Sequence, residues 1–303
     1  MSTPSSPGAQ APDLDRAAAL TLALVDDAAV FPPGSASVDD ALVAHRRHRT
    51  SWYADLVGPL LARSSAVREL ATALDAHGSA ADPVEVVLVA DAGLVRLAEA
   101  RAALLDDDRL EVVGVEVAIP AGDDLGDAAR RTLDALDVAV PAAVEVPRGS
   151  GWRDALDVLA DDGAERAKFR TGGLTPDAVP SDHQLALFVH ACLERRLPFK
   201  LTAGLHHLVR RTAPGTGMEE HGLLNVLAAV AAGLDGGSVE VVEEMVSLRD
   251  EALLRAVIDT ADARDLRRWF TSFGSCSIDE PRDELVAAGL LVPPPGTDMQ
   301  GVL

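Results

Sequence analysis

The chain has 303 residues, of which 48% are hydrophobic, and a net charge of −21 at neutral pH. The apolar content is enough for a large core, whereas a nucleic-acid-binding surface needs clustered basic residues, so the acidity argues against a nucleic-acid partner. No apolar run reaches the roughly 18 residues that a membrane helix needs, and the two cysteines, Cys192 and Cys276, make no metal or disulfide spacing. We therefore expect a cytoplasmic protein with no membrane partner, no resident metal and no other cofactor.

The two ends of the chain differ in composition from its middle. Residues 1–13 are rich in Ser, Pro and Ala and lack the basic start and apolar stretch of a signal peptide, so we expect a disordered tail there. Residues 293–303 open on three consecutive prolines and predict a flexible C-terminal tail. Residues 14–292 are left as one domain, a size at which a single α/β barrel is common.

Strand-like and helix-like stretches alternate through the first two thirds of this domain. The first strand is predicted over Leu22–Phe31, and a long helical region, divided near Pro59, over Val38–Ala76. Apolar, Val-rich strands are then predicted to begin near Val84, Glu111, Val138, Arg166 and Leu197. Amphipathic helices are predicted between them, over Leu94–Leu105, Leu125–Leu136, Trp152–Asp162 and His183–Arg195.

The last third of the domain is richer in helix. A helix over His221–Ala232 and mostly helical sequence over Ser238–Ala261 precede a final strand over Leu266–Phe273 and a helix from Pro281. Val239–Val242 is the stretch in which an eighth strand could lie. Strands that alternate with helices predict βαβ units and a parallel sheet. We expect an α/β fold of the TIM-barrel type, (β/α)8, irregular at one strand, with an open doubly wound parallel sheet as the alternative.

Charged side chains stand inside two of the predicted strands. Since alternate side chains of a barrel strand point to the interior and to the helices, Lys168 and Arg170 share one face, and Lys200 and Thr202 share one face of the next strand. The other faces are apolar and suit the helix layer, so we expect the charged faces to point inward. A purely structural core would hold Val, Ile and Leu there.

Three carboxylates are expected to face these cations. Glu116, Glu145 and Asp91 stand in or at the end of other Val-rich strands, in positions that alternate with apolar residues. Inward carboxylates opposite inward cations would make a neutralised polar centre. Asp26 and Asp27 end the first strand, where one of them either faces the site or belongs to an ordinary turn.

Lys168 and Lys200 are the only lysines among 27 basic residues. In an Arg-rich chain we expect lysine where arginine cannot substitute, and only lysine can lose its proton and act as an amine nucleophile. Neighbouring strands lie about 4.8 Å apart, so the two ammonium groups could lower each other's pKa and activate one for attack on a carbonyl. The alternative is that each lysine simply pairs with Glu116 or Glu145.

Two short motifs carry a resemblance to a known family. Lys168-x-x-Thr171-Gly172 and Lys200-x-Thr202-x-Gly204 resemble the two lysine motifs of the deoxyribose-phosphate aldolase family. The resemblance implies that Lys168 forms a Schiff base and that Lys200 tunes it. Arg170 stands where the family has a small residue, and our strand count places the motifs on strands five and six, one earlier than the family would.

A longer set of segments resembles a bacterial, actinobacterial-type protein family whose activity is uncharacterised. This resemblance extends over more of the chain than the lysine motifs but implies no activity. The segments are 168–173, 199–207, 221–225 and 272–281.

Histidines follow the second lysine motif. His206 and His207 are adjacent, and an imidazole can act as a metal ligand or as an acid or base near neutral pH. A metal site would add His221 and a carboxylate, but no fixed metal spacing such as HExxH occurs. We therefore expect His206 to carry protons or to hydrogen-bond within its loop. His207, His221 and Asn225 are expected to contact substrate, although Asn225 could instead secure the His206 loop.

The turn after the final strand is a candidate anion site. Ser277 and Glu280 fit a capping box, and the N–H groups at a helix start bind anions. Barrels often hold phosphate on the loops after their last strands. A plain helix cap is the alternative, and Cys276 is not expected to be a nucleophile because nothing identifies a paired base. The residues expected to hold a phosphate or carboxylate are Ser275, Ser277, Arg170, Thr171, Gly172, Gly173 and Thr202.

These observations favour a lyase of aldolase type that acts on a small anionic carbonyl substrate, a sugar phosphate or a keto acid. Lys168 would attack the carbonyl, Lys200 would depress its pKa, and Glu145, Asp91 or His206 would move protons. One alternative is a metal-dependent isomerase or hydrolase on the same barrel. Another is a non-catalytic metabolite-binding protein. Barrels of this size often form homo-oligomers, so self-association is possible.

Overall fold

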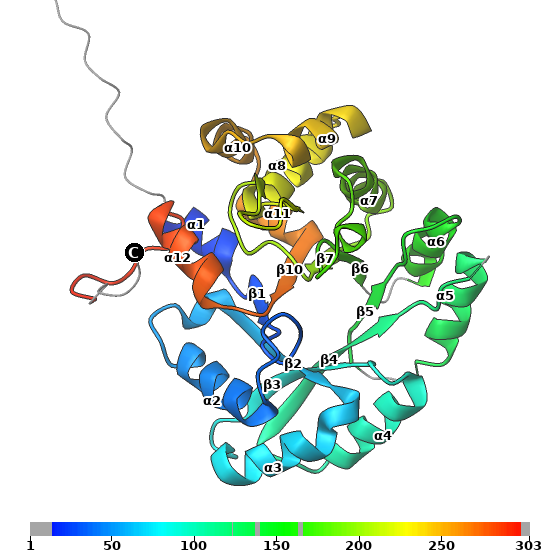
Figure 1. Ribbon diagram of the computed structural model, residues 1–303, viewed down its shortest axis with the longest axis vertical. Coiled ribbons are helices and arrows are strands. Elements are labelled where there is room, and N and C mark those ends of the chain that lie inside the picture. Colours follow the sequence, from blue (N-terminus) through cyan, green and yellow to red (C-terminus); the bar gives the residue numbers. More distant parts are fainter. Residues whose placement is uncertain (1–13, 123, 137–139, 163–165, 298–303) are drawn as a thin grey trace, which may run out of the picture.

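The computed structural model describes residues 14–122, 124–136, 140–162 and 166–297. Within these residues, eight strands close into a barrel in the order β1-β10-β7-β6-β5-β4-β3-β2, surrounded by helices (Figure 1). Every neighbouring pair is parallel. The predicted α/β barrel of the TIM type is confirmed, and the open doubly wound sheet is not formed.

The barrel strands each lead into at least one helix before the next strand begins. The strands are β1 (Val25–Asp27), β2 (Val57–Arg63), β3 (Val84–Val89), β4 (Leu110–Ala118), β5 (Ala142–Glu145), β6 (Arg166–Arg170), β7 (Phe199–Thr202) and β10 (Phe270–Ser275). The helices are α1 (Leu14–Thr21), α2 (Val38–Arg49), α3 (Val67–His77), α4 (Leu94–Leu104), α5 (Leu125–Asp134), α6 (Trp152–Asp162), α7 (Asp182–Glu194), α8 (Leu223–Leu234), α9 (Val239–Ser247), α10 (Glu251–Ile258), α11 (Ala263–Trp269) and α12 (Asp279–Ala287). Short elements are the 3-10 helices η1 (Ala54–Leu56), η2 (Ser64–Ala66) and η3 (Pro176–Ala178), and the antiparallel pair β8 (Arg211–Thr212) and β9 (Glu219–Glu220).

The apolar faces of the strands pack against the helix layer. Phe169 of β6 stacks on Phe188 of α7 with ring centroids 4.4 Å apart, and Phe199 of β7 meets the same ring edge-on at 5.6 Å. All three rings are buried. Because successive side chains of a strand point to opposite faces, Lys168 and Lys200, next to these rings in sequence, point to the barrel interior, as the alternation predicts.

Helix α8 is the buried helix of the helix-rich segment between β7 and β10. Its residues 223–231 are buried and almost all apolar, a pattern that belongs to a helix covered on all sides. Helices α7, α9 and α10 supply that cover. The loop between β7 and α8, which carries the two adjacent histidines, therefore leads into a buried helix.

The eighth strand is β2, and it lies where the sequence predicts helix. Helix α2 ends at Arg49 and α3 begins at Val67, so the expected long helix over Val38–Ala76 is wrong in its middle. The alternative position for an eighth strand, Val239–Val242, is also wrong because it forms the start of α9. The short spacing of apolar residues before and after Pro59 suits either type of element, and barrel closure decides between them.

A glycine and a proline fit β2 to its neighbour. The register between β1 and β2 shifts between the pairs Val25–Val57 and Asp27–Leu60. Pro59 lies in this irregular stretch, a position at which a proline within a strand is tolerated. A Cβ atom on Gly58 would lie 2.3 Å from Asp26 Oδ1, so Gly58 makes room for this carboxylate inside the barrel.

Two other predicted strands differ in their boundaries from the structure, and a third cannot be compared. Strand β1 covers only three residues of the predicted Leu22–Phe31. The final strand was expected over Leu266–Phe273 but begins at Phe270, because Asp262 caps the short helix α11 that precedes it. The strand start predicted near Val138 lies outside the described residues.

The predicted tails fall largely beyond the part of the chain that is described. The expected disordered tail, 1–13, lies outside it, as does 298–303 of the expected C-terminal tail. Residues 293–297 follow α12 and form neither helix nor strand. Among the described residues, no helix is long and apolar enough to cross a membrane.

Candidate functional site

The two lysines lie side by side in the barrel interior. Strands β6 and β7 pair Lys168 directly with Lys200. The side chains are only 7% and 3% exposed, respectively. With β2 counted, the two strands are the sixth and seventh of the barrel, where the resemblance to the aldolase family would place them. The offset of one strand in our sequence-based count came from the missed strand β2.

Glu116 of β4 lies between the two lysines. Its Oε2 atom is 2.7 Å from Lys168 Nζ, and its Oε1 atom contacts Lys200 Nζ. Lys168 Nζ also lies 2.9 Å from Glu145 Oε2 at the end of β5. The expectation that Glu116 and Glu145 face the lysines is confirmed, so the alternative in which each lysine pairs with a carboxylate describes the resting network.

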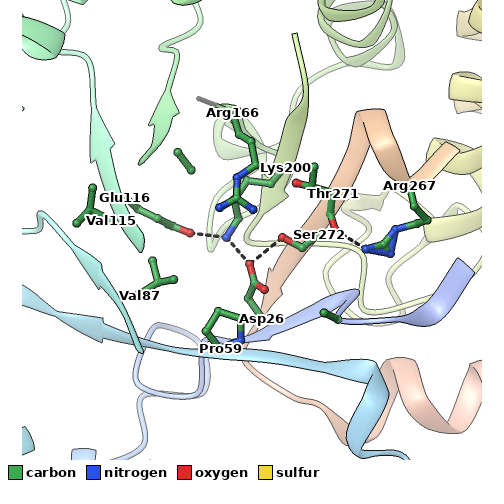
Figure 2. A pocket seen from close by; sticks show the side chains of 12 residues that line it. Asp26, Pro59, Val87, Val115, Glu116, Arg166, Lys200, Arg267, Thr271 and Ser272 are labelled. Atoms are coloured by element: carbon green, nitrogen blue, oxygen red, sulfur yellow. Dashed lines mark hydrogen bonds and ion pairs between the residues drawn. The ribbon is translucent and has the colours of Figure 1, made fainter. Parts of the chain in front are cut away.

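A third carboxylate completes the network from β1. Asp26 Oδ2 contacts Lys200 Nζ and accepts a hydrogen bond of 2.8 Å from Ser272 Oγ of β10 (Figure 2). Asp26 and Ser272 are both buried. From the sequence, Asp26 could either face the site or belong to a turn, and the structure places it in the network. Ser272 was not predicted, because a serine in a strand carries no signal of its own.

The network keeps both lysines charged. Burial alone would lower the pKa of Lys168, but Glu116 and then Glu145 outweigh burial and raise it. The pKa of Lys200 is raised in the same way by Asp26 and Glu116. The expectation that the two lysines depress each other's pKa is therefore wrong, because the carboxylate between them dominates.

The same balance holds Glu116 ionised. Burial would raise the pKa of this carboxyl, but Lys168 first and Lys200 second lower it to about 2. A buried carboxylate with an ammonium on each oxygen avoids the large penalty of an unpaired buried charge. Glu116 is thus the central anion on which both lysines depend.

Glu145 and Arg170 connect the network to the carboxyl-terminal mouth of the barrel. They are the last residues of β5 and β6, and barrel enzymes carry their active sites at this end of the strands. The Glu145 side chain is 20% exposed and that of Arg170 is 47% exposed, with Arg170 Nε 3.4 Å from Glu145 Oε1. Glu145 is thus the partly exposed partner of Lys168 at this end of the barrel.

The glycine turns after β6 and β7 interlock. The N–H and hydroxyl groups of Thr171 both donate to the carbonyl of Thr202, at 2.9 and 3.1 Å. A Cβ atom on Gly172 would lie 2.0 Å from the Ala203 carbonyl oxygen, and one on Gly204 would lie 2.6 Å from Thr171 Oγ1. The motif residues thus have a structural role in joining two neighbouring turns. Substrate binding by them stays a prediction.

Gly173 also lies where a side chain would not fit. A Cβ atom there would be 2.5 Å from the Cβ atom of Ala178 in η3. The close approach brings the turn after β6 against the short helix that leads to α7. Its predicted role in anion binding is not tested by this contact.

Asp91 does not belong to the lysine network. It follows β3 and is exposed, and its carboxylate accepts hydrogen bonds from Ser64 Oγ and Ser65 N, both 3.0 Å long. Burial tends to raise its pKa, but the bonds from Ser65 and Ser64 outweigh burial and lower it. The expectation that Asp91 faces inward is wrong because the strand ends before it and the carboxylate binds the turn after β2.

His206 makes a pair of contacts that the sequence does not predict. Its Nδ1 atom is 2.7 Å from Glu280 Oε2 in α12, and its Nε2 atom is 4.0 Å from Cys276 Sγ. The contact with Cys276, supported by Glu280, raises the pKa of His206 to about 9. Cys276 thus has a histidine partner that the sequence did not identify, and the expectation that Cys276 is not a nucleophile is not tested by this contact.

His207 and His221 have partners other than Cys276 and Glu280. His207 Nδ1 contacts Glu284 Oε1, and His207 Nε2 is 3.7 Å from Glu220 Oε2. His221 is buried with its Nε2 atom 2.9 Å from the carbonyl oxygen of Pro180, and burial lowers its pKa. The histidines thus have separate partners. In the part of the chain that is described, no group of three His, Cys, Asp or Glu residues is placed to hold a metal ion.

Asn225 secures the loop that carries these histidines. The wholly buried side chain accepts a hydrogen bond of 2.8 Å from Arg210 N and donates bonds of 2.7 Å to the carbonyls of Met245 and Leu248. All its hydrogen-bonding groups are thus engaged within the protein. The structural alternative for Asn225 is confirmed, and the expectation that it contacts substrate is wrong for this conformation.

The serines before α12 form half of the predicted capping box. Ser277 Oγ accepts a hydrogen bond of 3.2 Å from Glu280 N, but the Glu280 side chain turns to His206 instead of the capping position. Ser275 is buried and its hydroxyl donates to the Ser277 carbonyl at 2.7 Å. The predicted anion site at this turn is not tested by these contacts.

A cavity of about 190 Å³ borders the lysine network (Figure 2). Its lining includes Arg166 at the start of β6 and Arg267 in α11. Arg267 donates to backbone carbonyls, and burial lowers its pKa to about 10. Lys200, but not Lys168, lines this cavity.

Comparison with known proteins adds no functional assignment. No protein-family model and no curated protein matches the chain.

Proposed function

We propose that the protein is a lyase of aldolase type in which Lys168 forms a Schiff base with the carbonyl of a small anionic substrate, a sugar phosphate or a keto acid. The observation that carries the proposal is the position of Lys168, buried between Glu116 and Glu145 and in register with Lys200. The α/β barrel is compatible with such chemistry. The resemblance of the two lysine motifs to the deoxyribose-phosphate aldolase family supports the same assignment.

The carboxylates disfavour the first step of this chemistry and favour the next. Lys168 rests as an ammonium group, so it must transfer a proton before it can attack, and Glu145 is the contacting carboxylate that is exposed at the mouth. The amine nitrogen then bonds to the carbonyl carbon, and the carbonyl oxygen leaves as water after protonation. The resulting iminium carries the same positive charge as the ammonium group, so Glu116 and Glu145 stabilise it over neutral intermediates.

The iminium is the species that accepts electrons when a neighbouring carbon–carbon bond breaks. A network that holds a positive charge at this nitrogen therefore stabilises the reactive intermediate. Lys200 and Asp26 complete the charge balance around Glu116 and keep that carboxylate ionised. In this proposal Lys200 acts as a positioning residue and Glu145 carries protons to and from solvent.

Arg170 is the cation available for the anionic part of the substrate. Its guanidinium is about half exposed at the mouth and holds Glu145 only through a long contact of 3.4 Å. Guanidinium groups suit carboxylate and phosphate geometry. A substrate anion on Arg170 would place its carbonyl toward Lys168, which lies two residues earlier on the same face of β6.

Borohydride trapping tests the proposal. The protein would be incubated with a panel of aldehydes, keto acids and sugar phosphates, reduced with sodium borohydride and mapped by peptide mass spectrometry. We expect an adduct on Lys168, its loss in Lys168→Arg, and slower formation in Lys200→Arg, which keeps the charge. Because the chain has only two lysines, the map is nearly unambiguous. No adduct on Lys168 across the panel would overturn the proposal.

A further inference from the structure

A second reactive group stands at the same end of the barrel as Glu145. Cys276 follows β10, and His206 lies in the loop after β7, the strand that pairs with β10. His206 Nε2 lies 4.0 Å from the cysteine sulfur, and its other ring nitrogen lies 2.7 Å from Glu280. A thiol, an imidazole and a carboxylate are therefore arranged in series, with the imidazole between the other two.

The surroundings hold Cys276 in place while leaving it accessible. The residue is partly exposed, and the loop after β1 packs against it, since a Cβ atom on Gly34 would lie 3.0 Å from the Cys276 Cβ atom. The other cysteine, Cys192, is wholly buried in α7, and burial raises the pKa of its thiol. The two cysteines of the chain thus occupy opposite environments.

His206 is placed to give a proton to a group at Cys276. The contact with Cys276 raises the pKa of His206 to about 9, so the ring nitrogen that faces the sulfur can carry a proton. Glu280 accepts from the other ring nitrogen and fixes which nitrogen faces the sulfur. The nearby His207 is paired with Glu284 and lies within 4 Å of a second carboxylate, so it does not compete for this thiol. Cysteines next to a protonated histidine are generally the reactive ones.

We propose that Cys276 is a nucleophilic thiol, activated by His206 and Glu280, that adds reversibly to the carbonyl carbon of an aldehyde. The sulfur–carbon bond forms as the electron pair of the carbonyl moves to oxygen, and that oxygen takes the proton of His206 Nε2 to give a thiohemiacetal. Reversal returns the proton to His206 and releases the aldehyde. No oxidant or further reactant is required.

The choice of an aldehyde rests on the proposed function, whereas the reactivity of the thiol does not. Cleavage of an aldol releases a carbonyl fragment, and β6, β7 and β10 are consecutive in the barrel. Cys276 therefore stands two strands from the lysine that would hold the other fragment. In this position the thiol would retain an aldehyde at the mouth until Lys168 is free.

Alkylation by iodoacetamide tests the activation of the thiol. The sulfur displaces iodide, and peptide mass spectrometry reports Cys276 and Cys192 separately in the same sample. We expect Cys276 to react about ten-fold more slowly in His206→Gln than in the wild type at pH 6, and the difference between the two rates to narrow toward pH 9, where the His206 ring loses its proton. Glu280→Gln should give an intermediate profile. Cys192 should stay unmodified in every variant with an unchanged circular dichroism spectrum.

Protection by an aldehyde tests the acceptor. In Lys168→Arg, which cannot form an imine at that position, glycolaldehyde should slow the alkylation of Cys276 by an amount that saturates with its concentration. Equal pH profiles of wild type and His206→Gln, or no protection in Lys168→Arg, would overturn this inference and leave lysine trapping unaffected. A failure to trap Lys168 with protection intact would instead overturn the proposed function alone.

Discussion

Replacing Glu116 with glutamine should destabilise the fold strongly at neutral pH. The change keeps the size of the side chain and removes the anion that lies between Lys168 and Lys200. Each lysine keeps one carboxylate, Glu145 or Asp26, but the two ammonium groups are left opposite each other in the buried interior. The amide also presents a donor where both neighbours are donors.

The size of the effect follows from the pKa of Glu116. Folding lowers this pKa from 4.5 to about 2, so the folded state favours the ionised form by on the order of 3 kcal/mol. Removing one member of a buried ion network typically costs about 3–5 kcal/mol, which agrees in size. Because the folded pKa is depressed, this contribution is present above pH 4.5 and is lost as the pH falls through about 2.

Urea unfolding followed by circular dichroism measures the difference. We expect Glu116→Gln to lose about 3 kcal/mol at pH 7 and the gap to the wild type to shrink below pH 4.5. Glu111→Gln is the matched control, because Glu111 lies exposed on the same strand and should change stability by less than about 0.5 kcal/mol. A Glu116→Gln protein as stable as the wild type at pH 7 would refute the bridging role.

Three further predictions concern other parts of the site. Gly172→Ala should lower the free energy of unfolding by more than about 2 kcal/mol, because its Cβ atom would lie 2.0 Å from a backbone oxygen. Gly122→Ala, which has open space around it, should be nearly neutral in the same urea unfolding measurement. Similar losses of stability in both variants would contradict the interlocked turns. Asn225→Ala should cost on the order of 2 kcal/mol and lower the melting temperature by several degrees, since three hydrogen bonds of this buried side chain are lost, and an unchanged melting curve would count against its role in the loop. The initial rate of borohydride trapping at Lys168 should rise about ten-fold per pH unit between pH 7 and 9, because the raised pKa keeps most of the lysine protonated; a flat profile would show that deprotonation does not limit the reaction.

Local periodicity in the sequence was sufficient to predict most of the strands and helices, but not all of them. The alternation of Val-rich and amphipathic stretches predicted the barrel, since the two-residue period of a strand and the 3.6-residue period of a helix can each be recognised within a single element. The middle of Val38–Ala76 failed, because the apolar residues around Pro59 fit a helix as well as a strand. Only the closure of the sheet between β1 and β3 requires β2 there.

The prediction of where single side chains point was likewise correct only where local alternation applies. Residues inside a strand, such as Lys168 and Glu116, were directed correctly because their neighbours in sequence fix which face they occupy. Asp91, just past the end of β3, was not, since the alternation stops where the strand stops. Its direction depends on the serines after β2.

The sequence by itself favoured an α/β barrel over an open sheet and directed Lys168, Lys200, Glu116 and Glu145 inward, because alternation within a strand is enough to sort inward from outward residues. The tertiary structure alone decided how these groups are paired. Glu116 and Lys200, like Cys276 and His206, are far apart along the chain and meet only when the barrel closes. The charge of each lysine depends on that pairing, since the potential at a buried ammonium group is set by the groups within a few ångströms of it.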